Sequence, residues 1–258
     1  MAKWQIFIGR VTLFPQLTAP AALPSPALLF RQVWGNDPDA YQKAANPMAP
    51  SFAQGKVNEF AATCAVHPTR IDLQVMGQQG PESVGTLTVV EDTAGLHGEM
   101  AGIIHAVGSM GINCSRAAIY IQLVTLTPDV KTANQVLIGV IPKTYGIQIQ
   151  DEEDFIFQVN RPYKSAAVPT LEMNSILKWS LEKFQVIKLI VPPGGIASPA
   201  SGSITNPENQ EFITASLSFD VNNRPARLGS HDQESVLSEA LERVSAAQKE
   251  LGFKLKGW

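Results

Sequence analysis

The chain has 258 residues, of which 45% are hydrophobic and 17% charged, and its formal net charge is -3. Such a composition is typical of a folded globular protein and excludes a disordered or fibrous chain. The slightly acidic balance, with a sequence pI of about 5.8, argues against a broad electrostatic grip on nucleic acid or on anionic lipid. Two cysteines are too few for a disulfide scaffold.

The sequence also predicts a cytoplasmic protein with no membrane partner. The longest strongly apolar run, 186–191, contains Lys188 and is far shorter than a membrane span. The first eight residues are followed at once by Gly9-Arg10, so they lack the apolar core of a signal peptide.

In the first half of the chain, Ser25-Pro26 is a typical helix opening, and Gly35 is a typical helix end. Between 69 and 76, apolar and polar residues alternate with the period of a strand that has one wet face. We predict strands at 4–14, 56–66, 69–76 and 117–126, helices at 27–34 and 96–110, a short strand or helix approach at 87–90, and an irregular stretch at 36–54 with a possible helical turn at 39–45.

In the second half, the clearest pattern is a helix over 232–251 with one apolar face. Ser230 and Gln233 have the spacing of a capping box at its start. The stretch 170–180 has a mixed pattern, and 192–209 is rich in Gly, Pro and Ser and predicts an exposed loop. We predict strands at 135–141, 154–160, 184–191 and 211–221.

A unit of strand, loop, helix, glycine and extended segment occurs twice, at 85–126 and at 211–258. The first half also has the ferredoxin-like order of strand, helix, two strands, helix and strand. The sequence therefore predicts an α+β fold with two ferredoxin-like-related halves, mostly antiparallel sheets and a long C-terminal helix packed on one face. The halves would be 1–127 and 128–258, or the chain would form one continuous domain.

Cys64 and His67 are the closest Cys/His pair and the first candidates for a catalytic site, and His231 is a third. On one strand their odd separation places Cys64 and His67 on opposite faces, and a nucleophile must lie within hydrogen-bond reach of its base. The bend at Pro68 could bring them closer. The structural alternative is a buried cysteine that behaves as a small hydrophobe.

Asp220, Arg224 and Arg227 lie near the start of the last helix and are candidate ligand-binding residues, because two arginines beside a helix N-terminus can hold an anion. The alternative is an ordinary solvated loop. For metals, Cys64 and Cys114 lack further ligands nearby. Two histidines on one predicted helix, at 97 and 105, are separated by about 12 Å of rise, too far for one ion. We predict no metal and no cofactor.

Two short motifs resemble those of a family of proteins. They are Ser115-Arg-Ala-Ala-Ile-Tyr120, which follows a helix, and Ser218-Phe-Asp-Val221, which precedes the final helix. In these motifs and in the order of its elements the chain resembles a sporadically distributed family of uncharacterised bacterial proteins of similar length. The resemblance implies an architecture and a bacterial origin, and carries over no catalytic residue.

No catalytic or ligand-binding motif stands out, so the leading hypothesis is a non-enzymatic protein that binds a protein partner or associates with itself. The low charged share and the long irregular stretches at 36–54 and 192–209 favour it. A second hypothesis is a hydrolase or transferase with an unrecognised Cys/His site. A third is RNA binding by a duplicated ferredoxin-like fold, which requires a basic, aromatic surface strip.

Overall fold

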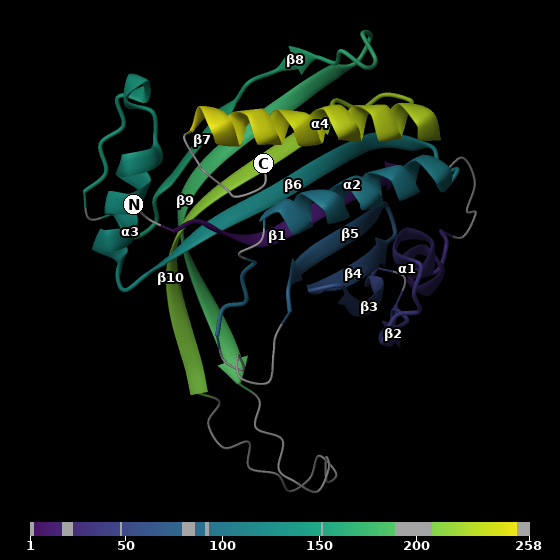
Figure 1. The fold of residues 1–258 in the computed structure, drawn as a ribbon, viewed down its shortest axis with the longest axis horizontal. Coiled ribbons are helices and arrows are strands. Elements are labelled where there is room, and N and C mark those ends of the chain that lie inside the picture. Colours follow the sequence, from purple (N-terminus) through teal and green to yellow (C-terminus); the bar gives the residue numbers. More distant parts are fainter. Residues whose placement is uncertain are drawn as a thin grey trace, which may run out of the picture.

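The computed structural model shows one large antiparallel sheet with helices packed on one side of it (Figure 1). It describes residues 3–16, 23–46, 48–78, 86–90, 93–150, 152–188 and 208–251. Within these residues no helix is both long and apolar enough to cross a membrane. The structure therefore confirms the α+β class, the antiparallel sheet and the C-terminal helix that the sequence predicts.

The first half of the chain supplies six strands and two helices of the described structure. Ser25 caps the first helix by accepting a hydrogen bond from the Leu28 amide, and Gly35 ends it in a left-handed conformation, as predicted. The elements are β1 (Gln5–Pro15), α1 (Pro26–Trp34), β2 (Ala40–Gln42), β3 (Ser51–Val57), β4 (Phe60–His67), β5 (Arg70–Gly77), α2 (Thr93–Ser109) and β6 (Cys114–Thr127).

The second half begins with a helix, continues as strands and ends in the longest helix described. The elements are α3 (Val130–Val140), the short 3-10 helix η2 (Lys143–Tyr145), β7 (Ile156–Asn160), β8 (Tyr163–Lys164), β9 (Glu172–Lys188), β10 (Glu208–Asn223) and α4 (Ser230–Glu250). The predicted loop 192–209 and the second extended segment, 252–258, lie almost entirely outside the described residues.

The sheet has the order β2-β3-β4-β5-β1-β6-β10-β9-β7, with β8 paired to β9. The two halves of the chain join through β6 and β10, which pair from Ala118–Asn222 to Thr127–Ile213. In the first half the order β4-β5-β1-β6 is the one that a ferredoxin-like unit requires. The second half does not repeat it, because β7, β9 and β10 form a meander. The expected pair of ferredoxin-like halves is therefore not confirmed.

The four α-helices of the described structure cover the same face of the sheet. The alternating residues that point to this face form one buried hydrophobic cluster with the inward sides of the helices, and α3 joins it through Ala133 and Leu137. Two buried apolar residues, Ala118 and Val124, lie outside the cluster because they point to the other face. Burial of this cluster is the main force that holds the sheet and helices together.

Helices α2 and α4 lie side by side on the sheet, and three glycines of α2 behave differently there (Figure 1). A side chain added at Gly108 would meet the Glu234 side chain of α4, whereas Gly98 and Gly102 have nothing within 4 Å of such an atom. Of these three positions, only Gly108 therefore packs closely against α4.

Several predicted elements differ from the structure. The stretch 135–141 belongs to α3, because Asp129 caps a helix whose apolar side includes Ala133 and Leu137. The single strand at 56–66 is a hairpin that turns at Asn58, which adopts a positive φ of 51°. The helical turn at 39–45 is instead the short strand β2.

At the start of α4, the predicted capping box is wrong. Gly229 is the N-cap residue, and Ser230 is already helical. The Gln233 side chain is buried and donates hydrogen bonds to the carbonyl oxygens of Ile112 and Leu228, so it ties α4 to the chain before β6. Gln233 does form side-chain hydrogen bonds near the start of α4, but with carbonyl groups outside the helix rather than with a capping residue.

Candidate functional site

The face of the sheet that turns away from the helices, here called the open face, is the candidate functional site. Among the described residues no helix lies on it, and polar side chains alternate on it with the buried apolar residues of the opposite face. Its central part consists of Arg10, Thr12 and Phe14 of β1, Asp72 and Gln74 of β5, Arg116, Ala118, Tyr120 and Gln122 of β6, and Ser218, Asp220 and Asn222 of β10.

At one end, the sheet curls toward the open face. The rings of Phe7 and Phe184 are 4.8 Å apart between their centroids, although β1 and β9 are separated in the sheet by β6 and β10. A β-bulge interrupts the pairing of β1 with β6 at Phe7 and increases the local bend. Thr214 and Ser216, on β10 between the two rings, are fully buried as a result.

Asp72 is the centre of one hydrogen-bonded cluster on the open face. Its carboxylate accepts from the Thr12 hydroxyl at 2.8 Å and lies 2.9 Å from the Arg70 Nε and 3.2 Å from the His67 Nε2. The Asp72 side chain is only 9% exposed. A buried carboxylate requires such partners, so this cluster fixes the side chains of three strands relative to one another.

Two further acids on the open face, Glu182 of β9 and Asp220 of β10, also have partners. The Glu182 carboxylate accepts from Gln122 at 2.7 Å and from Ser180 at 2.8 Å, and it forms an ion pair with Lys178. Asp220 accepts from the Asn222 side-chain amide at 2.7 Å. Both carboxylates therefore have hydrogen-bond partners within the protein, and Glu182 also has a cation beside it.

Two arginine–aromatic pairs occupy the middle of the open face. The Arg10 guanidinium lies over the Tyr120 ring, 5.0 Å from its centroid, and the Arg116 guanidinium lies 5.3 Å from the centroid of Phe14. Burial, opposed by a hydrogen bond with Ser218, raises the pKa of Tyr120. The phenol therefore stays neutral at physiological pH, and its ring is a platform for the cation.

These two guanidinium groups have no acid of their own. The Nε atoms of Arg10 and Arg116 are buried without a hydrogen-bond partner, and neither residue forms an ion pair within the part of the chain that the structure describes. Both side chains are only half-buried, so their remaining N–H groups carry a charge that no carboxylate of the described residues neutralises, which favours an acceptor from another molecule.

The structure does not bring the catalytic candidates together. Cys64 points into the core and His67 to the open face, where it contacts Asp72. Burial, with a smaller contribution from the charge of Asp72, raises the pKa of the Cys64 thiol to about 12. His231 is exposed on α4, which packs on β6 and β10 rather than on β4. Burial likewise raises the pKa of Cys114 to about 12.

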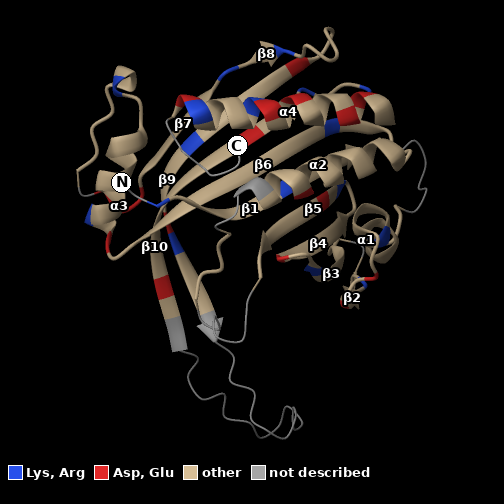
Figure 2. Cartoon of the chain, in the orientation of Figure 1, with Lys and Arg blue, Asp and Glu red and all other residues tan. Residues whose placement is uncertain are grey.

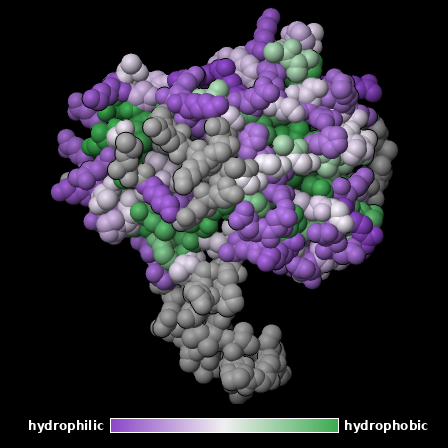
Figure 3. All heavy atoms as spheres, in the orientation of Figure 1, coloured by the Kyte–Doolittle hydropathy of each residue, from purple (hydrophilic) through white to green (hydrophobic). Residues whose placement is uncertain are grey.

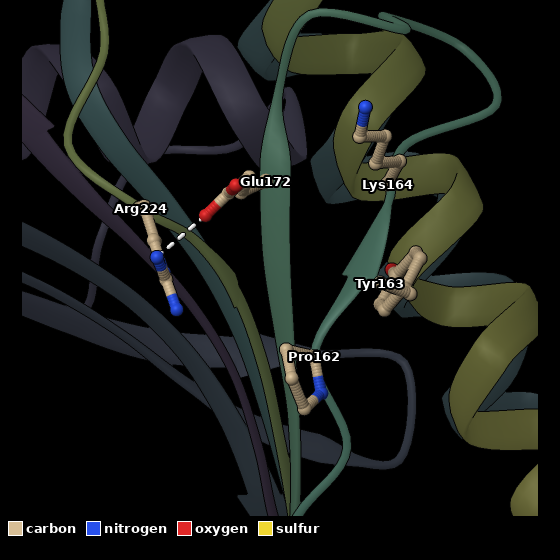
Figure 4. Close-up of a pocket in the computed structure, with 5 residues that line it drawn as sticks. All are labelled: Pro162, Tyr163, Lys164, Glu172 and Arg224. Atoms are coloured by element: carbon tan, nitrogen blue, oxygen red, sulfur yellow. Dashed lines mark ion pairs between the residues drawn. The ribbon is translucent and has the colours of Figure 1, made fainter.

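The ligand-binding candidates are also dispersed. Asp220 lies on the open face, and Arg227 is exposed in the loop before α4. Arg224 forms an ion pair with Glu172 beside a pocket of about 300 Å³ that is also lined by Pro162, Tyr163 and Lys164 (Figure 4). Because Glu172 neutralises Arg224 within the pocket, this site has less unpaired charge than the middle of the open face.

The sequence alone did not single out Arg10, Phe14 or Arg116 as site residues. The period of two in each strand could show that Arg10 and Phe14 share a face, and the same holds for Arg116 and Tyr120. Their meeting depends on the register of β1 with β6, in which Arg10 lies opposite Tyr120 and Phe14 opposite Arg116. These residues are more than 100 positions apart in the chain, so no local pattern reveals the pairing.

Comparisons with family models, curated proteins and solved structures found no match to this chain. The bacterial family resemblance therefore stays a prediction.

Proposed function

We propose that this protein is a non-catalytic binding protein that receives an acidic segment of a partner protein on its open face. The observation that carries the proposal is the pair of guanidinium groups of Arg10 and Arg116, which form no ion pair among the described residues, on a face whose central acids have hydrogen-bond partners. A partner that supplies carboxylates would neutralise these two half-buried charges.

The distribution of charge over the molecule supports an acidic partner on this side. Helix α4, on the opposite side of the sheet, contains five acidic and two basic residues between 230 and 250. Figure 2 marks acidic positions, interspersed with basic ones, along the α4 ribbon, and Figure 3 shows hydrophilic residues among smaller hydrophobic patches on that side. The net charge of -3 is therefore unevenly distributed, and an acidic partner is repelled by α4 and attracted to the open face.

The placement of Cys64 argues against the alternative of a Cys/His hydrolase or transferase. A nucleophilic thiol needs a lowered pKa and an accessible sulfur. Cys64 is fully buried, its pKa is raised, and its side chain points to the face opposite His67.

RNA binding is a second candidate, because the open face carries the basic and aromatic residues that this function requires. Both rings described above, however, are already covered on one side by a guanidinium group, which leaves less surface for base stacking. The net negative charge also weakens attraction to phosphate backbones.

Site-specific photo-crosslinking tests the proposal. A benzoylphenylalanine at Gln74 on the open face is expected to capture an acidic protein from a lysate of the source organism, whereas the same group at Ser238 on the outer side of α4 is not. Capture from Ser238 alone contradicts the open face as the binding surface. Crosslinking of RNA to the probe at position 74, recognised as a species that nuclease treatment shortens, favours the second candidate.

A further inference from the structure

We propose that the middle of the open face contains a seat for a single oxyanion, a carboxylate or a phosphate group, held between Arg10 and Arg116 above Thr12 and Ala118. The two arginine–aromatic pairs are arranged symmetrically about this position. Arg10 of β1 lies opposite Tyr120 of β6, and Arg116 of β6 lies opposite Phe14 of β1. Thr12 and Ala118 form the cross-strand pair midway between them.

The floor of this seat is made of small side chains that larger neighbours cover. Thr12 is 6% exposed and Ala118 is 8% exposed, although this face carries no helix among the described residues. Arg10 and Phe14 are separated by about 13 Å along β1, at roughly 3.3 Å per residue. The side chains that border this floor along the two strands are those of Arg10, Phe14, Arg116 and Tyr120, and two of these four are arginines.

The chemistry of the seat fits an oxyanion. Guanidinium groups present fixed N–H donors that match carboxylate and phosphate oxygens, and stacking on an aromatic ring restricts their orientation. The nearest acid of β5, Asp72, is occupied by Thr12, Arg70 and His67. On the other side, Asn222 of β10 lies opposite Ala118 and is neutral, and it donates a hydrogen bond to Asp220, which lies opposite Tyr120. An anion at the seat therefore meets two guanidinium groups that form no ion pair among the described residues.

The inference deepens the proposed function, since the oxyanion would be an acidic or phosphorylated side chain of the partner. It can also be tested separately with small anions. The probes are sodium acetate, inorganic phosphate and chloride at constant ionic strength, and the readout is the side-chain Nε–H resonance of each arginine in NMR spectra of the full chain.

The seat predicts that acetate or phosphate shifts the Arg10 and Arg116 resonances together, along one saturating curve, while exposed Arg227 does not follow it. In Arg116→Gln the half-saturating concentration for Arg10 is expected to rise about tenfold or more, because one of two charged donors is lost. Arg227→Gln is the matched control and leaves the curve unchanged. A thermal melt of each variant verifies that it is folded.

Three outcomes would overturn the seat. They are unsaturable shifts at every arginine, a response to chloride equal to that of the oxyanions, and an Arg10 curve that is unaffected by Arg116→Gln. A preference for phosphate over acetate identifies a phosphorylated group, and the reverse identifies a carboxylate. If small anions saturate the seat but no acidic protein crosslinks to the open face, the seat is correct and the proposed partner is wrong.

Discussion

Asp72 should contribute much more to stability than an exposed aspartate that also forms an ion pair. In Asp72→Ala the buried Thr12 hydroxyl loses its acceptor, which costs about 1–3 kcal/mol. Arg70 and His67 also lose their partner, but both are partly exposed, so water replaces most of that interaction. We expect a total loss of about 2–4 kcal/mol in the free energy of unfolding, or about 4–16 °C in Tm for a chain of this size.

The matched control is Asp37→Ala. Asp37 pairs with Arg31, but its side chain is 72% exposed, and pairs of this kind contribute about 0–1 kcal/mol. Urea unfolding followed by circular dichroism measures both variants against the wild type. If the two substitutions change the free energy of unfolding by the same amount, the reasoning that Asp72 organises the open face is refuted.

Two further predictions concern the helix-bearing side and the core. Gly98→Ala and Gly102→Ala should each stabilise the protein by about 0.5–1 kcal/mol, whereas Gly108→Ala should not. Equal increases in Tm for all three variants would contradict the packing of α2 against α4. Because burial raises the pKa of Cys64 and Cys114 from 9.0 to about 12, stability is expected to fall as pH rises above 9, where the unfolded thiols ionise first. The Cys64→Ala/Cys114→Ala variant should lose less stability than wild type between about pH 8 and pH 10.5 in urea titrations, and an unchanged slope would show that the thiols are not the cause.

Local patterns predicted those elements whose stabilising contacts are local or one-sided. The apolar face of α4 and the Ser25 and Gly35 signals of α1 are of this kind, and the structure confirms both helices. The predictions were wrong where a short window was ambiguous. Residues 135–141 are apolar enough for a strand, and only the longer repeat from the Asp129 cap identifies α3.

The candidate site could be predicted only in part. His67 and Asp220 were singled out and do lie on the open face, but for reasons other than those proposed from the sequence. The seat between Arg10 and Arg116 requires the register of two strands that are brought together by the whole sheet. Sheet register is set by burial of the opposite face, which is a property of the complete fold.

The central proposal is that the open face binds an acidic partner. Its most direct test uses the partner that crosslinking identifies, purified separately. Isothermal titration calorimetry measures the affinity of this partner for the wild type, for Arg10→Gln/Arg116→Gln and for the control Arg227→Gln. We expect the double variant to bind at least about tenfold more weakly, and the control to bind within about twofold of wild type. Equal affinities for wild type and the double variant would contradict the claim.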